Sequence, residues 1–487
     1  MAKFNRKVVN PTLTTNLAGG EAFQESPELH FVSTLLTSFV EDQFYKKASE
    51  SLKTVRSLID VIPDKMFVAK AAIYARNEFG MRSISHVVAG EIAKKVKGID
   101  WTKRFFNAVV RRPDDMMEIL AYYLVNYGKP VPNSLKKGLA AAFDKFDAYQ
   151  LSKYRGESKA VSLVDVVNLV HPKPIASNAS ALKQLVADAL KSTETWEAKL
   201  SSAGQLARTE VEKEELKEQA WTSLIKEKKL GYLALLKNLR NIVEQAPEVL
   251  DDALAMLIDP ALIGKSLVLP FRYGTAYKEM ETSVTKASTK AEIAMFEKIK
   301  GALATAASTS LSNIPDLLGK TLVALDVSGS MEGRPFDIGA MFSVALKCKM
   351  NADLIIFSNS AKYISLPKTE DIFENIEFIR KHSEFSGTNF HSVFKTAKYA
   401  YDRIIILSDM QAWMGYNTPK TSFNEYKKAT GCSPLIYTFD LAGHGTLQFP
   451  EPKVYALAGW SDKVFDIMKI LETDRQALIN TINAVTF

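Results

Sequence analysis

The chain has 487 residues, of which 47% are hydrophobic and 24% are charged, and its net charge is +7. This composition is typical of a soluble globular protein and excludes a disordered chain, and the length predicts two or three domains. The sequence contains no run of about twenty apolar residues, which excludes a membrane-spanning helix. The first ten residues lack the apolar core of a secretory signal, so no leader is expected.

Cysteine usage indicates the compartment. Cys348 and Cys432 are the only cysteines, and no Cys-x-x-Cys spacing occurs. This argues against a disulfide framework and excludes a zinc knuckle. We therefore expect a cytoplasmic protein.

The positive charge is unevenly distributed. From residue 321 onward there are 17 Lys and Arg against 18 Asp and Glu, so the whole surplus lies in residues 1–320. A basic excess in one domain points towards a polyanionic partner, most simply nucleic acid. An excess of this size over so many residues is also ordinary surface chemistry, so composition leaves both interpretations open.

Residues 1–25 read as an arm, and residues 26–318 show the periodicity of short amphipathic helices. Brief breaks containing Pro, Gly or Asp separate the helices, for example at 63–64 and 130–132. Arg111 and Arg112, before Pro113, are interpreted as cations that oppose the dipole of an ending helix. The pattern predicts a solenoid of antiparallel helix pairs with a concave face, ending in one long helix over about 276–311.

Residues 319–487 instead alternate between strand and helix patterns. Strands are predicted over 321–325, 352–357, 363–366, 403–407, 434–439 and 454–458, and helices over 336–350, 370–381, 390–399, 421–430 and 462–471. This alternation predicts an α/β domain with a doubly wound sheet.

Oxygen-bearing side chains follow two of these strands. Asp326, Ser328 and Ser330 come after the first, Asp409 comes after a later one, and Thr388 precedes a helix. Ligands of open α/β sheets gather outside the carboxyl ends of the strands, so these residues are expected to converge. Carboxylates and hydroxyls suit Mg²⁺ and not zinc. The alternative is a polar turn that caps the next helix.

The Asp-x-Ser-x-Ser motif, the distant Thr and the later Asp resemble the metal-ion-dependent adhesion site (MIDAS) of von Willebrand factor A domains. This resemblance assigns residues 319–487 to such a domain. It implies that Ser328, Ser330 and Thr388 coordinate a divalent metal directly, and that Asp326 and Asp409 act through water. It also implies an open coordination position that a partner's carboxylate could fill.

Stretches of the helical part resemble the TROVE module of the Ro autoantigen family, namely residues 131–139 followed by 151–155, then 167–174, and further on 230–241. The resemblance implies a HEAT-like helical-repeat ring closed by the von Willebrand factor A domain, in a monomer. It implies binding of small noncoding Y RNA on the outer ring surface and of single-stranded ends of misfolded RNA in a basic central hole. Bacterial relatives use the Y RNA to tether an exoribonuclease.

Candidate RNA-binding residues come from two arguments. The resemblance carries over Lys153, Arg155 and His171, with Lys159 as a substitute. Lys136 and Lys137 at a helix start, followed by the Lys153-Tyr154-Arg155 segment, also interleave cations with an aromatic ring, which suits phosphate and base contacts. The alternatives are a solvated helix face for the cations and a helix-end role for His171.

Catalysis is not expected. No carboxylate, base or Lys is assigned beside the metal residues, and no phosphate-cradling Gly-x-x-x-x-Gly-Lys loop occurs. The sequence thus predicts an RNA-binding protein of a Ro-type ribonucleoprotein that serves RNA quality control or degradation. The competing class is an intracellular metal-dependent protein-recognition scaffold without RNA, and a metal-dependent hydrolase is a third.

Overall fold

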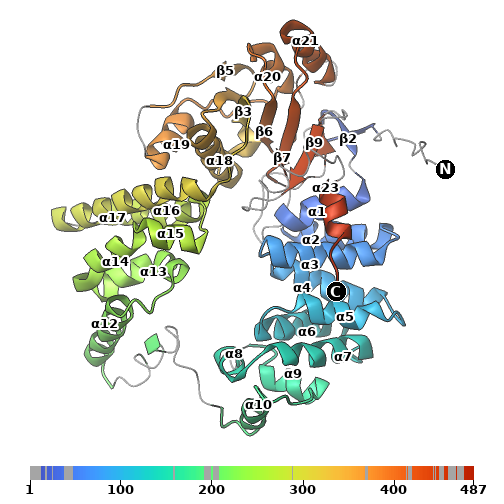
Figure 1. Ribbon diagram of the computed structural model, residues 1–487, viewed down its shortest axis with the longest axis vertical. Coiled ribbons are helices and arrows are strands. Elements are labelled where there is room, and N and C mark those ends of the chain that lie inside the picture. Colours follow the sequence, from blue (N-terminus) through green and yellow to red (C-terminus); the bar gives the residue numbers. More distant parts are fainter. Residues whose placement is uncertain are drawn as a thin grey trace.

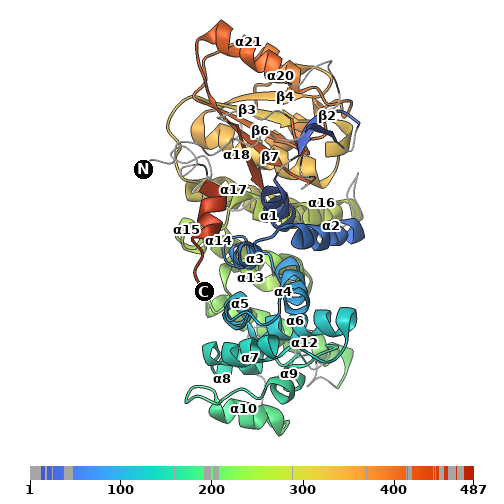
Figure 2. The ribbon, with the colours of Figure 1, turned by 90° about the vertical axis from the view of Figure 1, so that its right-hand side faces the viewer.

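The structure, a computed structural model, describes most of residues 13–487. Outside the described residues are 1–12, 17–18, 25, 38–47, 157–158, 191–198, 201–203, 205–207, 288, 368–370, 413, 415–418, 443, 445, 449–453, 459–467 and 469–476. Two groups of helices extend from a sheet domain (Figure 1), and we call α1–α10 the first arm and α12–α17 the second arm. Figure 2, turned by 90°, shows the arm helices stacked one below another away from the sheet.

Short helices build the first arm, as the periodicity predicts. They are α1 (Pro27–Thr37), α2 (Ala48–Val61), α3 (Lys65–Glu78), α4 (Ser83–Lys95), α5 (Trp101–Val109), α6 (Pro113–Tyr127), α7 (Asn133–Ala142), α8 (Ala148–Lys153), α9 (Leu163–Val170) and α10 (Ala179–Val186). The breaks between them carry helix-starting residues. The Asp64 side chain accepts from the first backbone N–H groups of α3, and Pro113 opens α6.

The second arm continues the same design. Its helices are α12 (Glu210–Lys226), α13 (Tyr232–Gln245), α14 (Leu250–Leu257), α15 (Pro260–Ser266), α16 (Tyr273–Lys286) and α17 (Lys290–Thr309). The single helix expected over 276–311 is wrong, because α16 and α17 are separate helices that pack side by side. Ala287 is extended, and Thr289 and Glu292 form a capping box that starts α17.

The sheet domain has the strand order β5-β4-β3-β6-β7-β9, with β5 antiparallel to β4 and the other pairs parallel. The strands are β3 (Thr321–Asp326), β4 (Asp353–Phe357), β5 (Ala361–Tyr363), β6 (Arg403–Ser408), β7 (Leu435–Asp440) and β9 (Val454–Ala458). The helices are α18 (Arg334–Met350), α19 (Ile372–Lys381), α20 (Phe390–Thr396) and α21 (Lys420–Thr430). The helix expected over 462–471 falls almost entirely outside the described residues.

Strand β3 is buried on both faces, which explains its uninterrupted apolar sequence. Val323 and Leu325 belong to the core that contains α18 and continues into the arms, whereas Leu322 and Ala324 belong to a second core with α20 and α21. The sheet therefore lies between two helical layers, as in a doubly wound fold.

Segments at both ends of the chain tie the first arm to the sheet domain. Residues 1–25 are expected to be an N-terminal extension. Within them, β1 (Leu13–Thr15) and β2 (Glu21–Gln24) form an antiparallel sheet with β8 (Thr446–Leu447). Helix α23 (Ala477–Asn483) packs on α3. Beyond it, the Phe487 ring lies 6.1 Å from the Trp101 ring of α5, centroid to centroid.

The second arm reaches the sheet domain through stacked rings. Phe271 stacks on Phe342 of α18 with centroids 5.5 Å apart, and Tyr277 stacks on Phe373 of α19 at 3.8 Å. The expected architecture, helical repeats followed by a doubly wound α/β domain, is thus confirmed. The chain between α10 and α12, which would join the two arms, lies largely outside the described residues. The central hole of the expected ring therefore stays a prediction.

None of the described helices has the length and apolar character needed to cross a bilayer.

Close packing of α5 against α7 gives a stability prediction. A Cβ atom on Gly138 of α7 would lie 2.5 Å from Phe106 Cβ and 2.7 Å from the Lys103 carbonyl oxygen of α5. Gly138→Ala is therefore expected to lower the free energy of unfolding by about 1–3 kcal/mol. Gly301→Ala in α17 meets nothing within 4 Å. That control is expected to raise stability by about 0.4–1 kcal/mol. Thermal unfolding followed by circular dichroism compares the two, and equal shifts would contradict the close approach.

Candidate functional site

The residues of the candidate metal site come together where the strand order reverses, at the carboxyl ends of the neighbouring strands β3 and β6. Asp326 ends β3 and Asp409 directly follows β6. Thr388 precedes α20. Backbone hydrogen bonds hold its loop to the other two, from Gly329 N to Ser386 O (2.8 Å) and from Met414 N to Thr388 O (3.3 Å).

Hydroxyl and amide groups surround the two carboxylates. The Ser328 N–H donates to Asp326 Oδ1 (2.9 Å), and the Ser408 hydroxyl donates to Asp326 Oδ2 (2.5 Å). Ser330 Oγ lies 3.5 Å from Ser328 Oγ, and the Ser330 hydroxyl hydrogen-bonds the Asp409 carboxylate. Sequence reasoning placed Ser408 at the strand end but gave it no role, although it directly orients Asp326.

Electrostatics show that this set suits a cation. Burial raises the pKa of Asp326 well above its ordinary range, and the Asp409 charge raises it further. Burial likewise raises the pKa of Asp409. Asp409 Oδ2 is buried and has no hydrogen-bond partner among the described residues. A divalent cation between the two carboxylates would relieve their repulsion and engage that oxygen, so the residues fit an oxygen-ligated metal.

The donor types also narrow the choice of metal. Within the described part of the chain, no group of three or more His, Cys, Asp or Glu side chains is positioned to hold an ion. The candidate set consists of two carboxylates completed by the hydroxyls of Ser328, Ser330 and Thr388. Such a set favours a hard cation such as Mg²⁺ over zinc.

The candidate RNA-binding residues lie on consecutive elements at the far end of the first arm (Figure 1). Lys136 and Lys137 are on α7, and Lys153 is the last residue of α8. His171 caps α9 in the left-handed conformation, with φ of 48°, and is exposed. Helix α9 packs against α7, and α10 packs against both α8 and α9, so these positions belong to one packed group of helices.

Two of these cations already have partners within the protein. Arg155 donates to the Leu190 carbonyl and pairs with Asp188 Oδ1 at 3.1 Å, which fastens the end of α10. The substitute, Lys159, pairs with Glu118 at 2.5 Å. By contrast, the side chains of Lys136 and Lys137 form no ion pair with any described residue. The structure also adds a cation, because the Arg112 guanidinium lies 4.4 Å from the centre of the Tyr154 ring.

Comparison with known proteins identifies the helical part. The TROVE domain family model matches residues 34–215, from α1 into the start of α12. This part of the chain is similar to the TROVE domain family.

Curated relatives align over part of this chain's length. Telomerase protein component 1 of Rattus norvegicus is 30% identical over 94 residues, or 18% of this chain. The same component of Mus musculus is 27% identical over 113 residues, or 21% of this chain. The aligned segment is only 4% of each relative.

A solved structure extends the likeness beyond the TROVE domain. The crystal structure of the RO (RSR) protein of Deinococcus radiodurans covers 90% of this chain, and the match covers 97% of that chain, with a TM-score of 0.60 and 16% identity. The two proteins share a fold, from the TROVE helices through the sheet domain. The expected resemblance to a TROVE-module protein of the Ro type is therefore confirmed.

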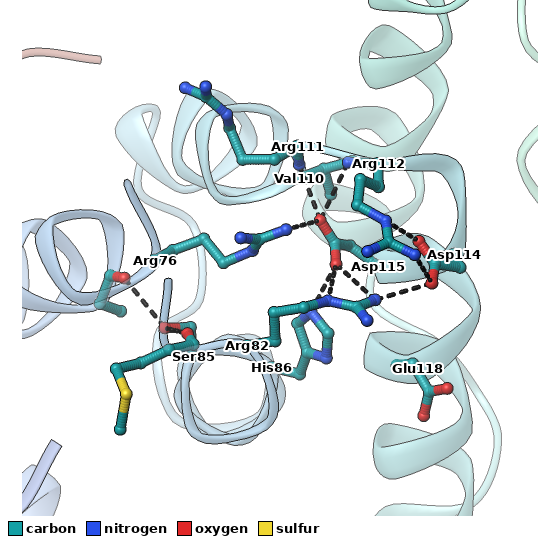
Figure 3. A network of polar contacts seen from close by, with 12 residues as sticks. Arg76, Arg82, Ser85, His86, Val110, Arg111, Arg112, Asp114, Asp115 and Glu118 are labelled. Carbon is teal, nitrogen blue, oxygen red and sulfur yellow. Dashed lines mark hydrogen bonds and ion pairs between the residues drawn. The ribbon is translucent and has the colours of Figure 1, made fainter. Parts of the chain in front are cut away.

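A buried carboxylate, Asp115 at the start of α6, organises the TROVE domain (Figure 3). It accepts from Arg76 Nη2 (2.9 Å), Arg82 Nη2 (3.0 Å) and His86 Nε2 (3.0 Å), and from the backbone N–H groups that precede α6. Burial raises the pKa of Asp115, but the hydrogen bonds and positive charges outweigh it and hold the pKa well below its ordinary value. This ionised carboxylate joins α3, α4 and α6.

The network also includes Arg111 and Arg112, which lie beyond the end of α5. Their backbone N–H groups donate to Asp115 Oδ2 at 2.9 Å and 3.0 Å. The Arg112 guanidinium binds Asp114, whereas the Arg111 side chain points away from the carboxylates (Figure 3). The Arg112 charge is thus held by an ion pair, and opposition to the dipole of α5 stays a prediction.

Proposed function

We propose that this protein is the RNA-binding component of a Ro-type ribonucleoprotein. The TROVE domain at residues 34–215 carries the proposal, and the Ro-like fold over 90% of the chain supports it. The ligand would be a small noncoding, Y-like RNA on the outer surface of the first arm at α7–α9, with single-stranded ends of misfolded RNA held between the arms. Its role would be RNA quality control or degradation, with an exoribonuclease tethered through the RNA.

Cations on α7 and α8 that are at least partly exposed support this site. Lys137 is exposed, and Lys136 and Lys153 are half-buried. The centre of the Tyr154 ring lies 5.7 Å from the Lys153 ammonium and 4.4 Å from the Arg112 guanidinium. A ring flanked by cations offers base stacking and phosphate neutralisation together. The free state of Cys348 and Cys432 supports the further proposal that the protein works in the cytoplasm, and we propose that it does so as a monomer.

The sheet domain would hold Mg²⁺ without catalysing a reaction. Ser328, Ser330 and Thr388 would coordinate the ion, and Asp326 and Asp409 would balance its charge. A bound divalent ion supplies a positive site for an incoming carboxylate. The second candidate function, a metal-dependent protein-recognition scaffold without RNA, would use the same metal site, where Asp409 Oδ2 has no hydrogen-bond partner among the described residues.

Crosslinking the protein to RNA in its host cell and sequencing the recovered RNA tests the proposal. Small structured RNAs with crosslinks on α7–α9 are expected. Recovery of no RNA, together with divalent-dependent capture of a protein ligand that is lost on Asp326→Ala, would favour the scaffold instead.

A variant tests the RNA site itself. Replacing Lys137, Lys153 and His171 by alanine is expected to weaken binding of structured RNA about tenfold or more. If two phosphate contacts are lost, the slope of log Kd against log salt concentration should also fall by about 1.8. Arg155 is kept because it fastens α10. Gel shifts at several salt concentrations measure both effects. Replacing Lys226, Lys228 and Lys229 of the second arm by alanine is the control, and equal weakening by both variants would reject the site.

A further inference from the structure

A cavity of about 520 Å³ lies in the first arm, between the end of α5, the start of α8 and the last residue of the chain. Its lining includes the cations Arg104, Arg111 and Lys145 and the rings of Phe146 and Phe487. The C-terminus lies beside α5 in both views of the molecule (Figures 1 and 2). The volume is within the range of small-molecule sites, roughly 300–1,000 Å³.

Of the three cations in this cavity, one is bound to the fold and two form no ion pair with any described residue. The Lys145 ammonium donates to the carbonyl oxygens of Asn107 and Val110, so it satisfies the end of α5. The guanidinium groups of Arg104 and Arg111 form no ion pair with any described residue, and Arg111 points away from the nearby carboxylates (Figure 3). Burial and the Arg111 charge lower the pKa of Lys145 to about 8. Lys145 and Arg111 are thus close enough to repel each other.

The aromatic wall of the cavity is fixed in place. Phe487 packs edge-on against Trp101 and Phe105, with ring centroids 6.1 Å and 6.2 Å apart. Phe146 is buried, with 2% of its surface exposed. Anchored rings lose little entropy when a planar ligand stacks on them.

From this juxtaposition we infer that the cavity binds a nucleotide, with its phosphate on Arg104 and Arg111 and its base against Phe487. Guanidinium groups bind phosphate oxygens through paired charge-assisted hydrogen bonds. An aromatic face accepts any base by stacking. The same chemistry serves a free nucleoside monophosphate or one unpaired nucleotide of an RNA strand. The inference stands apart from structured-RNA binding at α7–α9.

Calorimetric titration of the full-length protein with 5′-AMP, and separately with the single strand A8, tests this inference. Arg104→Ala combined with Arg111→Ala is expected to weaken binding at least about tenfold. Phe487→Leu keeps the apolar contact with Trp101 and is expected to weaken binding about fivefold or more through lost stacking. Lys103→Ala, which removes a cation of α5 outside the cavity, is expected to leave binding unchanged.

Loss of AMP binding in the double variant assigns the site to free nucleotides, and loss of A8 binding alone assigns it to an RNA strand. If the wild-type protein binds neither 5′-AMP nor A8, the inference is overturned. It is also overturned if the double variant binds these probes as tightly as Lys103→Ala does. The variant of Lys137, Lys153 and His171 should keep its AMP affinity. Failure of one proposal therefore leaves the other testable.

Discussion

Replacing Asp115 by alanine is expected to lower the free energy of unfolding by about 3–5 kcal/mol. The substitution leaves the buried Arg76 guanidinium without its carboxylate and two backbone N–H groups at the start of α6 without an acceptor. Buried charges and donors that lose their partners carry the full cost of desolvation. With a shift of roughly 2–4 °C per kcal/mol, Tm should fall by about 6–20 °C.

Asp114→Ala is the matched control, because Asp114 neighbours Asp115 on the same helix. Its partners, Arg82 and Arg112, keep about a third or more of their side-chain surface exposed, so water can replace the lost contact. The control should cost about 1 kcal/mol or less. Similar losses of Tm in the two variants would show that Asp115 does not organise the arm.

The pH dependence follows from the depressed pKa of Asp115. In the unfolded chain the carboxyl takes up a proton near pH 4, whereas in the folded protein it stays ionised. Its contribution is therefore complete above about pH 5 and is lost as the pH falls below that. The difference in Tm between the wild type and Asp115→Asn should shrink between pH 6 and pH 3. A difference that is constant or grows towards acid would contradict the ionised assignment.

Elements that depend on local pattern could be predicted from the sequence. The apolar runs that form β3 and β6 are buried on both faces, so their composition alone identifies them. The loops after these strands must meet because parallel neighbours end at one edge of the sheet, and this rule alone brings Asp326 and Asp409 together. Thr388 lies between α19 and α20 and follows no parallel strand, so this rule does not predict its position.

Features that depend on distant partners could not be predicted. Asp115 follows two arginines in sequence, but its side-chain partners Arg76 and His86 come from two other helices. Strand β2 pairs with β8, more than 400 residues further along the chain. The binding role proposed for Arg104 depends on a C-terminal segment that folds back onto α5. No periodicity within one segment reveals such pairings, because they depend on tertiary packing.

Asp326→Asn is expected to abolish a magnesium-dependent rise in Tm that the wild type shows. A ligand at a hundred times its Kd stabilises the folded state by about 2.7 kcal/mol if it does not bind the unfolded chain. The candidate site places two buried carboxylates at adjoining loops, and these repel each other until a cation joins them. Thermal unfolding after treatment with EDTA, with and without added Mg²⁺, measures the difference.

The behaviour without metal separates a metal site from a structural role for Asp326. If the carboxylate served only to hold the loops through Ser328 and Ser408, Asp326→Asn would lower Tm with or without Mg²⁺. If it serves the cation, the variant removes a buried like-charge pair. Its Tm without metal should then equal or exceed that of the wild type. Asp353→Asn, at the amino end of β4 and so at the end of the strands away from the site, should keep the full response to Mg²⁺. A wild type whose Tm is the same in EDTA and in Mg²⁺ would show that these oxygens do not bind the ion.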